Sequence, residues 1–253
     1  MWSHSSIGLE RLATDEKVEG SNPSGTSKIE EFRRKLNLEK IVIIDTGSSN
    51  ILSLKRAVEI FHSNVDVTRD SQTILSAHKI FFPGVGAFKK VMKTLETRKL
   101  IETLAKTKEK EIPLFGICLG LQLFFNESEE FGPSKGLGLI DGNVKMLPKN
   151  SKDQEKLKIP NIGWFKLNLN KKFKNKKFSK FVSSIDEKIF YYFVHSYFVN
   201  PLKKENIVAT YNFGGHEIPA IVAKDNLIGC QFHPEKSGKR GLELISNFLR
   251  LSV

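Results

Sequence analysis

A cysteine flanked by glycines, between two apolar segments, constrains the fold of this chain more than any other feature. Residues 116–120 (Gly-Ile-Cys-Leu-Gly) follow the run Ile112–Phe115 and precede the apolar segment Leu121–Phe125. Glycines on both sides let the backbone bend sharply, so the pattern predicts a strand, a tight turn with Cys118 at its apex, and a helix. The dipole at the start of that helix favours a thiolate. For this segment alone, a buried structural cysteine is an equal alternative.

A histidine and a glutamate near the C-terminus supply the partners that a nucleophilic cysteine needs. His233 and Glu235 lie in a His-Pro-Glu-Lys-Ser segment, just after the apolar residues Leu227 and Ile228. A thiol needs a base that removes its proton, and the base needs a third group that fixes its tautomer. Residues i and i+2 of an extended segment face the same way, so the carboxylate can reach the ring. The two motifs together favour a triad with Cys118 over a core histidine.

A second glycine-rich segment, residues 81–86 (Phe-Phe-Pro-Gly-Val-Gly), ends another short apolar strand. Glycines free the backbone to aim N–H groups at a developing negative oxygen, which is usually the largest single contribution to acyl transfer. We therefore expect Gly84, Val85 and Gly86 to form part of an oxyanion site. An ordinary turn between a strand and a helix would explain this segment in isolation.

The order of the apolar segments predicts an α/β fold. Up to Ile117, strands of the buried type alternate with amphipathic helices, which indicates a doubly wound, mostly parallel sheet whose functional loops follow the carboxyl ends of the strands. From Leu139 onward, short strands indicate a smaller mixed or antiparallel section. The expected strands are 41–44, 65–68, 79–82, 113–117, 142–146, 163–169, 189–194, 207–211, 220–223 and 227–232, and the expected helices are 50–61, 87–95, 99–108 and 238–251.

Residues 1–38 do not share this pattern. Residues 20–27 (Gly-Ser-Asn-Pro-Ser-Gly-Thr-Ser) are turn-forming and poor in apolar side chains, so we expect a disordered extension followed by one domain over 39–253. Gly-Ser-Asn-Pro is also what translation of a tRNA T-arm would give, and an artefact of the start site is therefore a hypothesis. A shorter product would need a non-AUG start near Leu36–Ile41, because the next methionine is Met92.

The net charge of +12 raises the question of a nucleic-acid partner. Residues 145–180 contain twelve lysines against two acidic residues, but they lack arginine and any nucleic-acid-binding motif, so we expect a solvated basic surface and no nucleic-acid partner. A weaker alternative is attraction to phosphate-bearing substrates or to an acidic partner. No apolar run approaches the roughly 18 residues of a membrane span, and no signal peptide is evident. Two cysteines suggest no disulfide framework, which fits a reducing cytoplasm.

These motifs, in this order, resemble those of the class I glutamine amidotransferases. Segments 44–50, 160–164, 192–197 and 233–237 are further similar to the glutaminase subunits of imidazole glycerol phosphate synthase, an enzyme of histidine biosynthesis, and the resemblance runs from about Lys40 to the C-terminus. Two positions depart from that pattern: Asn161 replaces a usual histidine, and Phe165 replaces a usual asparagine. The resemblance places both near the surface that faces the partner.

The resemblance implies that the chain hydrolyses glutamine to glutamate and ammonia without a metal or cofactor. Cys118 would attack the amide carbon, His233 would move the protons and Glu235 would orient the histidine. An oxyanion would be held by the N–H of Leu119 and one from the loop of Gly84, Val85 and Gly86. Contacts with glutamine would come from four further residues, which are Gln122, His195, Ser196 and Tyr197.

The resemblance also implies a heterodimer with a barrel-fold cyclase, which would receive the ammonia through a tunnel and make imidazole glycerol phosphate and aminoimidazole carboxamide ribotide. It places Asn50, Trp164, Tyr192 and Lys236 at that interface. Two alternatives remain open at this point. One is a paralogous glutaminase that feeds another synthase, such as one forming amidino sugars, and the other is an interaction module without catalysis.

Overall fold

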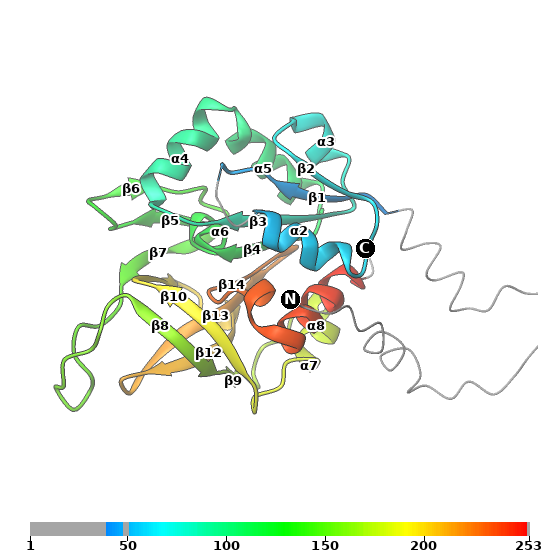
Figure 1. Ribbon diagram of the computed structural model, residues 1–253. Coiled ribbons are helices and arrows are strands. Elements are labelled where there is room, and N and C mark those ends of the chain that lie inside the picture. The colour runs from blue at the N-terminus through cyan, green and yellow to red at the C-terminus, as the bar shows by residue number, and fades with distance from the viewer. Residues whose placement is uncertain (1–38, 48–50, 252–253) are drawn as a thin grey trace, which may run out of the picture. The chain divides into compact units, whose positions relative to one another are not determined.

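An eight-stranded mixed sheet carries the functional loops in the computed structural model, which describes residues 39–47 and 51–251 (Figure 1). The strand order is β2-β1-β3-β4-β14-β13-β12-β9; neighbours from β2 to β14 run parallel, and those from β14 to β9 run antiparallel. The strands are β1 (Ile41–Ile44), β2 (Val65–Thr68), β3 (Lys79–Gly84), β4 (Leu114–Cys118), β9 (Asn168–Leu169), β12 (Ile207–Phe213), β13 (His216–Lys224) and β14 (Leu227–Cys230).

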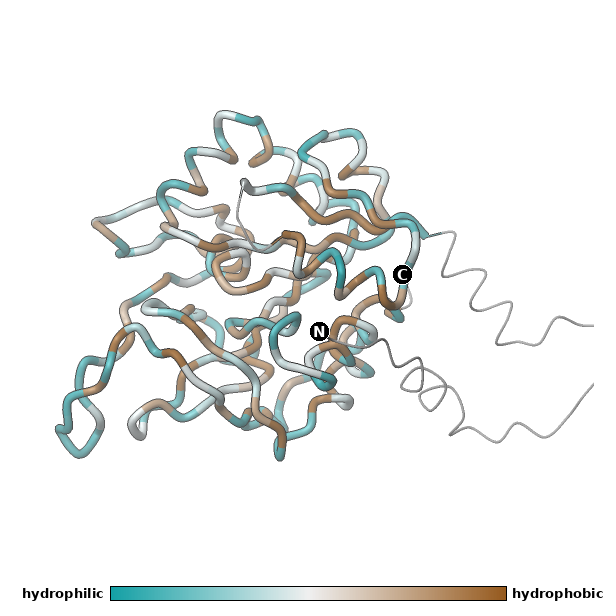
Figure 2. Tube along the Cα trace, in the orientation of Figure 1, coloured by the Kyte–Doolittle hydropathy of each residue, from teal (hydrophilic) through white to brown (hydrophobic). Residues whose placement is uncertain are grey.

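Helices cover both faces of this sheet, because its strands are apolar on both sides. In β1, Ile41 and Ile43 belong to one hydrophobic core, whereas Val42 and Ile44 belong to the other. The first core contains residues of α2 (Ile51–Glu59), α7 (Ser179–Ser183) and α8 (Gly238–Leu249), and the second those of α3 (Ser71–Leu75), α4 (Phe88–Thr97), α5 (Leu100–Glu109) and α6 (Leu119–Leu123). Figure 2 shows hydrophobic residues concentrated along the central strands. The doubly wound α/β prediction is therefore confirmed.

Two smaller sheets flank the carboxyl ends of the parallel strands. One pairs β8 (Asn161–Lys166) with β10 (Phe190–His195), and the other has the order β11-β7-β5-β6, from β5 (Phe125–Ser128), β6 (Ser134–Lys135), β7 (Ile140–Met146) and β11 (Tyr197–Pro201). The 3₁₀ helices are η2 (Lys176–Phe178), η3 (Lys204–Asn206) and η4 (Pro234–Lys236). These sheets contain β7, β8 and β10, which overlap the short strands expected at 142–146, 163–169 and 189–194, whereas the strands expected at 207–211, 220–223 and 227–232 belong to the eight-stranded sheet.

Several element bounds differ from the sequence-based expectations. The helix after Cys118 ends at Leu123, because Phe125 pairs with Ile140 of β7 and so begins a strand. The expected strand 163–169 is divided between β8 and β9. The expected disordered extension 1–38 lies outside the described residues. Among the described helices, none is long and apolar enough to cross a membrane.

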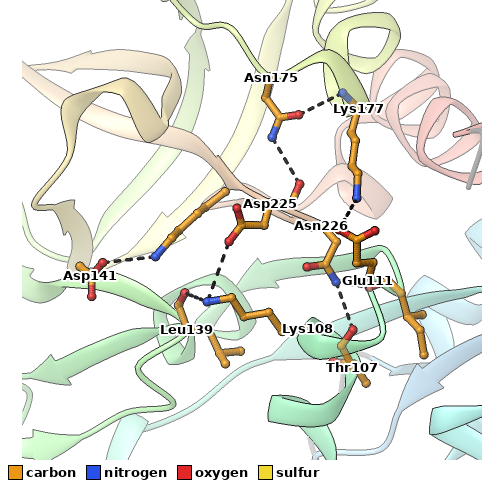
Figure 3. Close-up of polar contacts among 11 residues, drawn as sticks. Thr107, Lys108, Glu111, Leu139, Asp141, Asn175, Lys177, Asp225 and Asn226 are labelled. Carbon is orange, nitrogen blue, oxygen red and sulfur yellow. Dashed lines mark hydrogen bonds and ion pairs between the residues drawn. The ribbon is translucent and has the colours of Figure 1, made fainter.

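A buried asparagine fixes the turn between β13 and β14, at the end of the sheet where β4 and β14 begin (Figure 3). The side chain of Asn226 is only 2% exposed, and its amide nitrogen donates to the carbonyl oxygens of Thr107 (3.2 Å) and Ile112 (2.6 Å). Asn175 donates to the carbonyl of Asp225 at 3.3 Å from the loop before η2. These hydrogen bonds fix the start of β14 beside β4. Because β14 is a short strand, they also fix the position of its carboxyl end.

The first described residue takes part in a buried ion pair. The Lys79 side chain at the start of β3 is fully buried, and its Nζ lies 2.5 Å from Oε2 of Glu39. Removing one partner of a buried pair leaves an uncompensated charge, which is strongly destabilising. We therefore propose that the folded domain begins at Glu39.

Two truncated chains test this boundary. Deleting residues 1–38 should leave the free energy of unfolding in urea nearly unchanged, since that segment is poor in apolar residues. Deleting residues 1–39 should lower it by about 3 kcal/mol, because Lys79 loses its partner. Glu39→Gln in the full chain is the matched control and should reproduce the second loss. Equal stability of the two truncated chains would contradict the proposal.

Candidate active site

Cys118 occupies a strained turn between β4 and α6. Its φ of 55° and ψ of −112° are unusual for a residue with a side chain, and such strain is typical of functional turns. The flanking glycines explain how the turn is accommodated: a Cβ at Gly120 would lie 1.8 Å from the carbonyl oxygen of Phe82, and one at Gly116 would lie 2.8 Å from the nitrogen of Leu121. The sharp turn expected from the sequence is therefore present, and it requires the absence of a Cβ at both glycines.

His233 and Glu235 form a buried pair after β14. Nδ1 of the ring donates to Oε1 of Glu235 at 2.9 Å, and the two side chains are 4% and 1% exposed. Burial opposes the charged ring, but hydrogen bonds and charges from Cys118 and Glu235 outweigh it and raise the pKa of His233 to about 10. The ring is therefore held protonated beside the sulfur. The two residues meet through the 3₁₀ turn η4, and not through the extended segment that the sequence suggested.

The backbone of His233 is joined directly to strand β10. Its N–H donates to the carbonyl of Tyr192 at 3.0 Å, while the hydroxyl of Ser237 donates to the carbonyl of His233 at 2.7 Å. The same hydroxyl accepts the N–H of Tyr192 at 3.0 Å. Three hydrogen bonds thus fix the position of the histidine relative to β10.

A cavity of about 310 Å³ opens onto the sulfur and the imidazole. Of the residues that the resemblance singles out for the oxyanion and for glutamine, seven line it: Val85, Gly86, Leu119, Gln122, His195, Ser196 and Tyr197. Gly84 does not line the cavity and instead pairs in register with Cys118 in the β3–β4 ladder. A Cβ at Gly84 would lie 2.8 Å from the nitrogen of Gly120, so this glycine permits the close packing of the turn.

Three further residues line the cavity that the sequence did not single out, namely Glu130, Pro160 and Val194. Glu130 is the charged one, and its Oε2 accepts the N–H of Phe88 at 2.6 Å at the start of α4. The sequence offers no signal for it, because Glu127 and Glu129 stand in the same polar segment. Only the path of the chain between β5 and β6 distinguishes the three.

His195 is part of a buried polar chain. Burial lowers its pKa to about 4, so the ring is neutral near pH 7. Because a carbonyl only accepts, Nδ1 donates to Tyr197 O (2.9 Å), and Nε2 therefore accepts from the hydroxyl of Tyr211 (2.9 Å). Asn161 donates to that hydroxyl at 3.2 Å, and Phe165 packs against the same ring, with ring centroids 5.1 Å apart. The side chains of Asn161 and Phe165 therefore face the interior, whereas those of Ile162 and Trp164 on the same strand are exposed.

The expected partner-facing residues do not line the cavity. Trp164 is 52% exposed on β8, with its ring centroid 5.5 Å from that of Tyr192 on β10. Lys236 is exposed on η4. Asn50 lies outside the described residues. Within the described residues, no cluster of three or more His, Cys, Asp or Glu side chains could hold a metal ion.

The raised pKa of His233 predicts how its contribution to stability depends on pH. The folded value of about 10 lies above the ordinary 6.5, so the contribution is complete below pH 6.5 and is lost as the pH rises through about 10. Urea unfolding of the unmodified chain and of His233→Gln should show a stability difference that shrinks between about pH 6 and about pH 10. A difference that stays constant over this range would contradict the assigned interaction.

Comparisons with known proteins agree with this geometry. The family described as "Glutamine amidotransferase class-I" matches residues 42–251. Imidazole glycerol phosphate synthase subunit HisH 1 of Methanococcus maripaludis is 41% identical over 215 residues, which cover 83% of this chain and 99% of the relative. Subunit HisH of Methanocaldococcus jannaschii is also 41% identical, over 83% of this chain and 99% of the relative.

Solved structures show the same fold at lower identity. PurLQS from Thermotoga maritima aligns with a TM-score of 0.59 and 19% identity, over 84% of this chain and 98% of that one. The glutaminase domain of Trypanosoma brucei CTPS aligns with a TM-score of 0.57 and 17% identity, over 85% and 95%. The chain therefore belongs to the class I glutamine amidotransferases and, within them, to the HisH subunits of imidazole glycerol phosphate synthase.

Proposed function

We propose that this chain hydrolyses the side-chain amide of glutamine and passes the ammonia to a synthase partner in histidine biosynthesis. The observation that carries the proposal is the meeting of a strained cysteine and a protonated, carboxylate-bound histidine in one cavity. A glutaminase of this kind needs a nucleophile, a proton carrier and an oxyanion site at the same place. Family membership favours the same chemistry over an interaction module without catalysis.

In the first half of the reaction, the sulfur of Cys118 attacks the amide carbon of glutamine. The thiol proton has gone to His233, and Glu235 accepts the opposite N–H of the ring and fixes its orientation. The negative oxygen lies near the N–H of Leu119, because the first N–H groups of a helix have no acceptor within the helix. His233 then protonates the leaving nitrogen, so that ammonia departs and a thioester remains.

In the second half, water resolves the thioester. His233, now neutral, takes a proton from the attacking water, and the hydroxide adds to the thioester carbon. The carbon–sulfur bond breaks, glutamate leaves, and the His233–Cys118 pair is restored. Every proton taken by the ring is returned within one cycle, so the reaction consumes only glutamine and water.

The cavity suggests how the α-substituents of glutamine are held. Oε2 of Glu130 accepts a hydrogen bond from the N–H of Phe88, and the second carboxylate oxygen can accept one from the α-ammonium group. The hydroxyl of Ser196 in the same lining can donate to the α-carboxylate. The side-chain oxygen of Gln122 can accept from the α-ammonium group, because both hydrogens of its amide nitrogen are used within the protein. These roles follow from charge complementarity between the lining and a zwitterionic substrate.

An apolar strand face beside the cavity supports a protein partner. Ile162 and Trp164 of β8 are 59% and 52% exposed, and Phe190 of β10 is 50% exposed. The same β10 ends in Val194 and His195, which line the cavity. A partner on this face would lie next to the site where ammonia forms. We propose that the partner is the barrel-fold cyclase, in a heterodimer that channels ammonia through a tunnel.

The inward orientation of Asn161 and Phe165 removes the reason to prefer another synthase, since neither side chain lies on the exposed face of β8. The alternative of amidino-sugar formation therefore has no specific support. Both cysteines are free and buried, which supports a reducing compartment and hence the cytoplasm as the place of action.

Glutamate release tests the proposed nucleophile. Cys118→Ala should lower the rate by about 10⁴-fold or more, and His233→Ala should lower it further than Glu235→Ala, because the histidine moves protons while the carboxylate orients it. Cys230→Ser is the matched control and should keep most activity, since burial raises the pKa of the Cys230 thiol well above its usual value. Glutamate release that survives in Cys118→Ala would refute the assignment.

The loop after β3 should limit the rate until a partner binds. Gly86 has a φ of 103°, and a Cβ added there would meet no heavy atom within 4 Å, so the peptide beside it can reorient at little steric cost. If an oxyanion donor is withheld in the isolated chain, a cyclase carrying its own substrate should stimulate glutamate release about 10²- to 10³-fold. A high basal rate that does not depend on the partner would contradict this.

A glycine pair isolates the contribution of this loop. Gly86→Ala should reduce the stimulated rate far more than the basal rate, because a side chain at positive φ restricts the peptide. Gly132→Ala is the matched control, as Gly132 has a φ of 96° and similar free space but does not line the cavity. Gly84 is unsuitable for this test, because a side chain there would collide with the backbone of Gly120.

A further inference from the structure

A buried glutamine points its side-chain amide at the sulfur of Cys118. Gln231 follows β14 and is fully buried, and its backbone N–H donates to the carbonyl of Ala220 at 2.8 Å. Its side-chain Nε2 donates to Sγ of Cys118 at 3.7 Å. No motif of its own marks this residue in the sequence.

Two further hydrogen bonds determine which end of the Gln231 amide faces the sulfur. The carbonyl of Tyr197 can only accept, so the side-chain nitrogen of Gln122, 2.8 Å away, must be the atom that faces it. The second hydrogen of that nitrogen goes to Oε1 of Gln231 at 3.0 Å. Because its oxygen faces Gln122, Gln231 must present its nitrogen to Cys118.

An amide donor acts differently from the histidine. It does not titrate near neutral pH, so its hydrogen bond to the sulfur persists whatever the protonation state of the ring. A hydrogen bond to a charged acceptor is stronger than one to a neutral acceptor, and it therefore favours the thiolate over the thiol. The titratable groups around this sulfur are His233 with Glu235 behind it, Cys230 on the neighbouring strand β14, Glu130 and Tyr197 in the cavity lining, and the neutral His195.

We propose that Gln231, oriented by Gln122, is a second hydrogen-bond donor to the sulfur of Cys118 and stabilises its ionised form independently of His233. The inference rests on the proposed function only in treating Cys118 as the reacting thiol. The proton that leaves the thiol still goes to His233, and Gln231 transfers nothing. Its role is to hold the sulfur charged and directed before substrate arrives.

Alkylation of the thiol measures this role without glutamine. In a Cys230→Ser background, iodoacetamide reports on Cys118 alone among the two cysteines of the chain. Gln231→Met keeps a side chain of similar size and removes the donor. At pH values below the midpoint of the reference protein's pH–alkylation profile, its alkylation rate should fall by about tenfold, the lower end of the effect of a hydrogen bond to a charged group. The deficit should vanish at higher pH, where the alkylation rate of each protein has reached its plateau.

A second variant keeps the inference testable if Gln231→Met does not fold. Gln122→Met removes the nitrogen that orients Gln231 without adding a charge, so the amide is no longer held with its nitrogen toward the sulfur, and this variant should show a similar pH-dependent deficit. An unchanged alkylation rate in both variants would overturn the inference. A deficit of equal size at every pH would also overturn it, because that result indicates altered access to the thiol and not altered ionisation.

Glutamate release by the same proteins separates this inference from the proposed function. If Cys118→Ala still hydrolyses glutamine while Gln231→Met shows the pH-dependent deficit, the proposed function fails and the inference stands. If Cys118→Ala is inactive while Gln231→Met alkylates as the reference does, the inference fails alone.

Discussion

The close approach of α6 to the end of β3 is the contact on which the site depends. Gly120 lies so near the carbonyl of Phe82 that a Cβ there would come within 1.8 Å of its oxygen, and a Cβ at Gly84 of the same strand would lie 2.8 Å from the nitrogen of Gly120. This packing leaves the chain no room for a gradual turn, so Cys118 adopts a positive φ. It also brings the first N–H groups of α6 next to the loop after β3. One backbone contact thus places the proposed nucleophile, the start of α6 and the glycine loop next to one another.

The sheet order brings together chain segments that are far apart in sequence. β3, β4 and β14 are neighbours, so their carboxyl ends deliver the glycine loop, Cys118 and the segment that reaches His233 to one edge. The other end of β14 is fixed by Asn226, whose amide is bonded to two carbonyls near α5. The buried ion pair of Lys79 fixes β3 in the same region. Contacts at one end of the strands therefore determine the geometry of the site at the other.

The sequence predicted the parts of the site that depend on local chemistry. The local sequence alone predicts a sharp turn at the glycine-flanked cysteine and a contact between the histidine and the glutamate of the His-Pro-Glu segment. The structure brings the cysteine and the histidine to one cavity. The orientation of Asn161 could not be read in this way, because its side depends on which face of β8 packs on Tyr211. The sequence likewise gives no indication that Gln231 and Glu130 lie at the site. Their importance comes from neighbours on other strands, which no local pattern encodes.

The three hydrogen bonds that join Tyr192, Ser237 and His233 have a consequence for binding thermodynamics. One face of strand β10 is exposed to solvent, and the same strand is hydrogen-bonded to the backbone of His233. The outer surface and the inner site are therefore connected through one strand. Linkage between two equilibria is reciprocal. Suppose that a partner on β10 favours one arrangement of His233. A substrate that needs the same arrangement must then increase the affinity of the chain for that partner by the same free energy. A chain with substrate bound would then be the form that releases its neighbour most slowly.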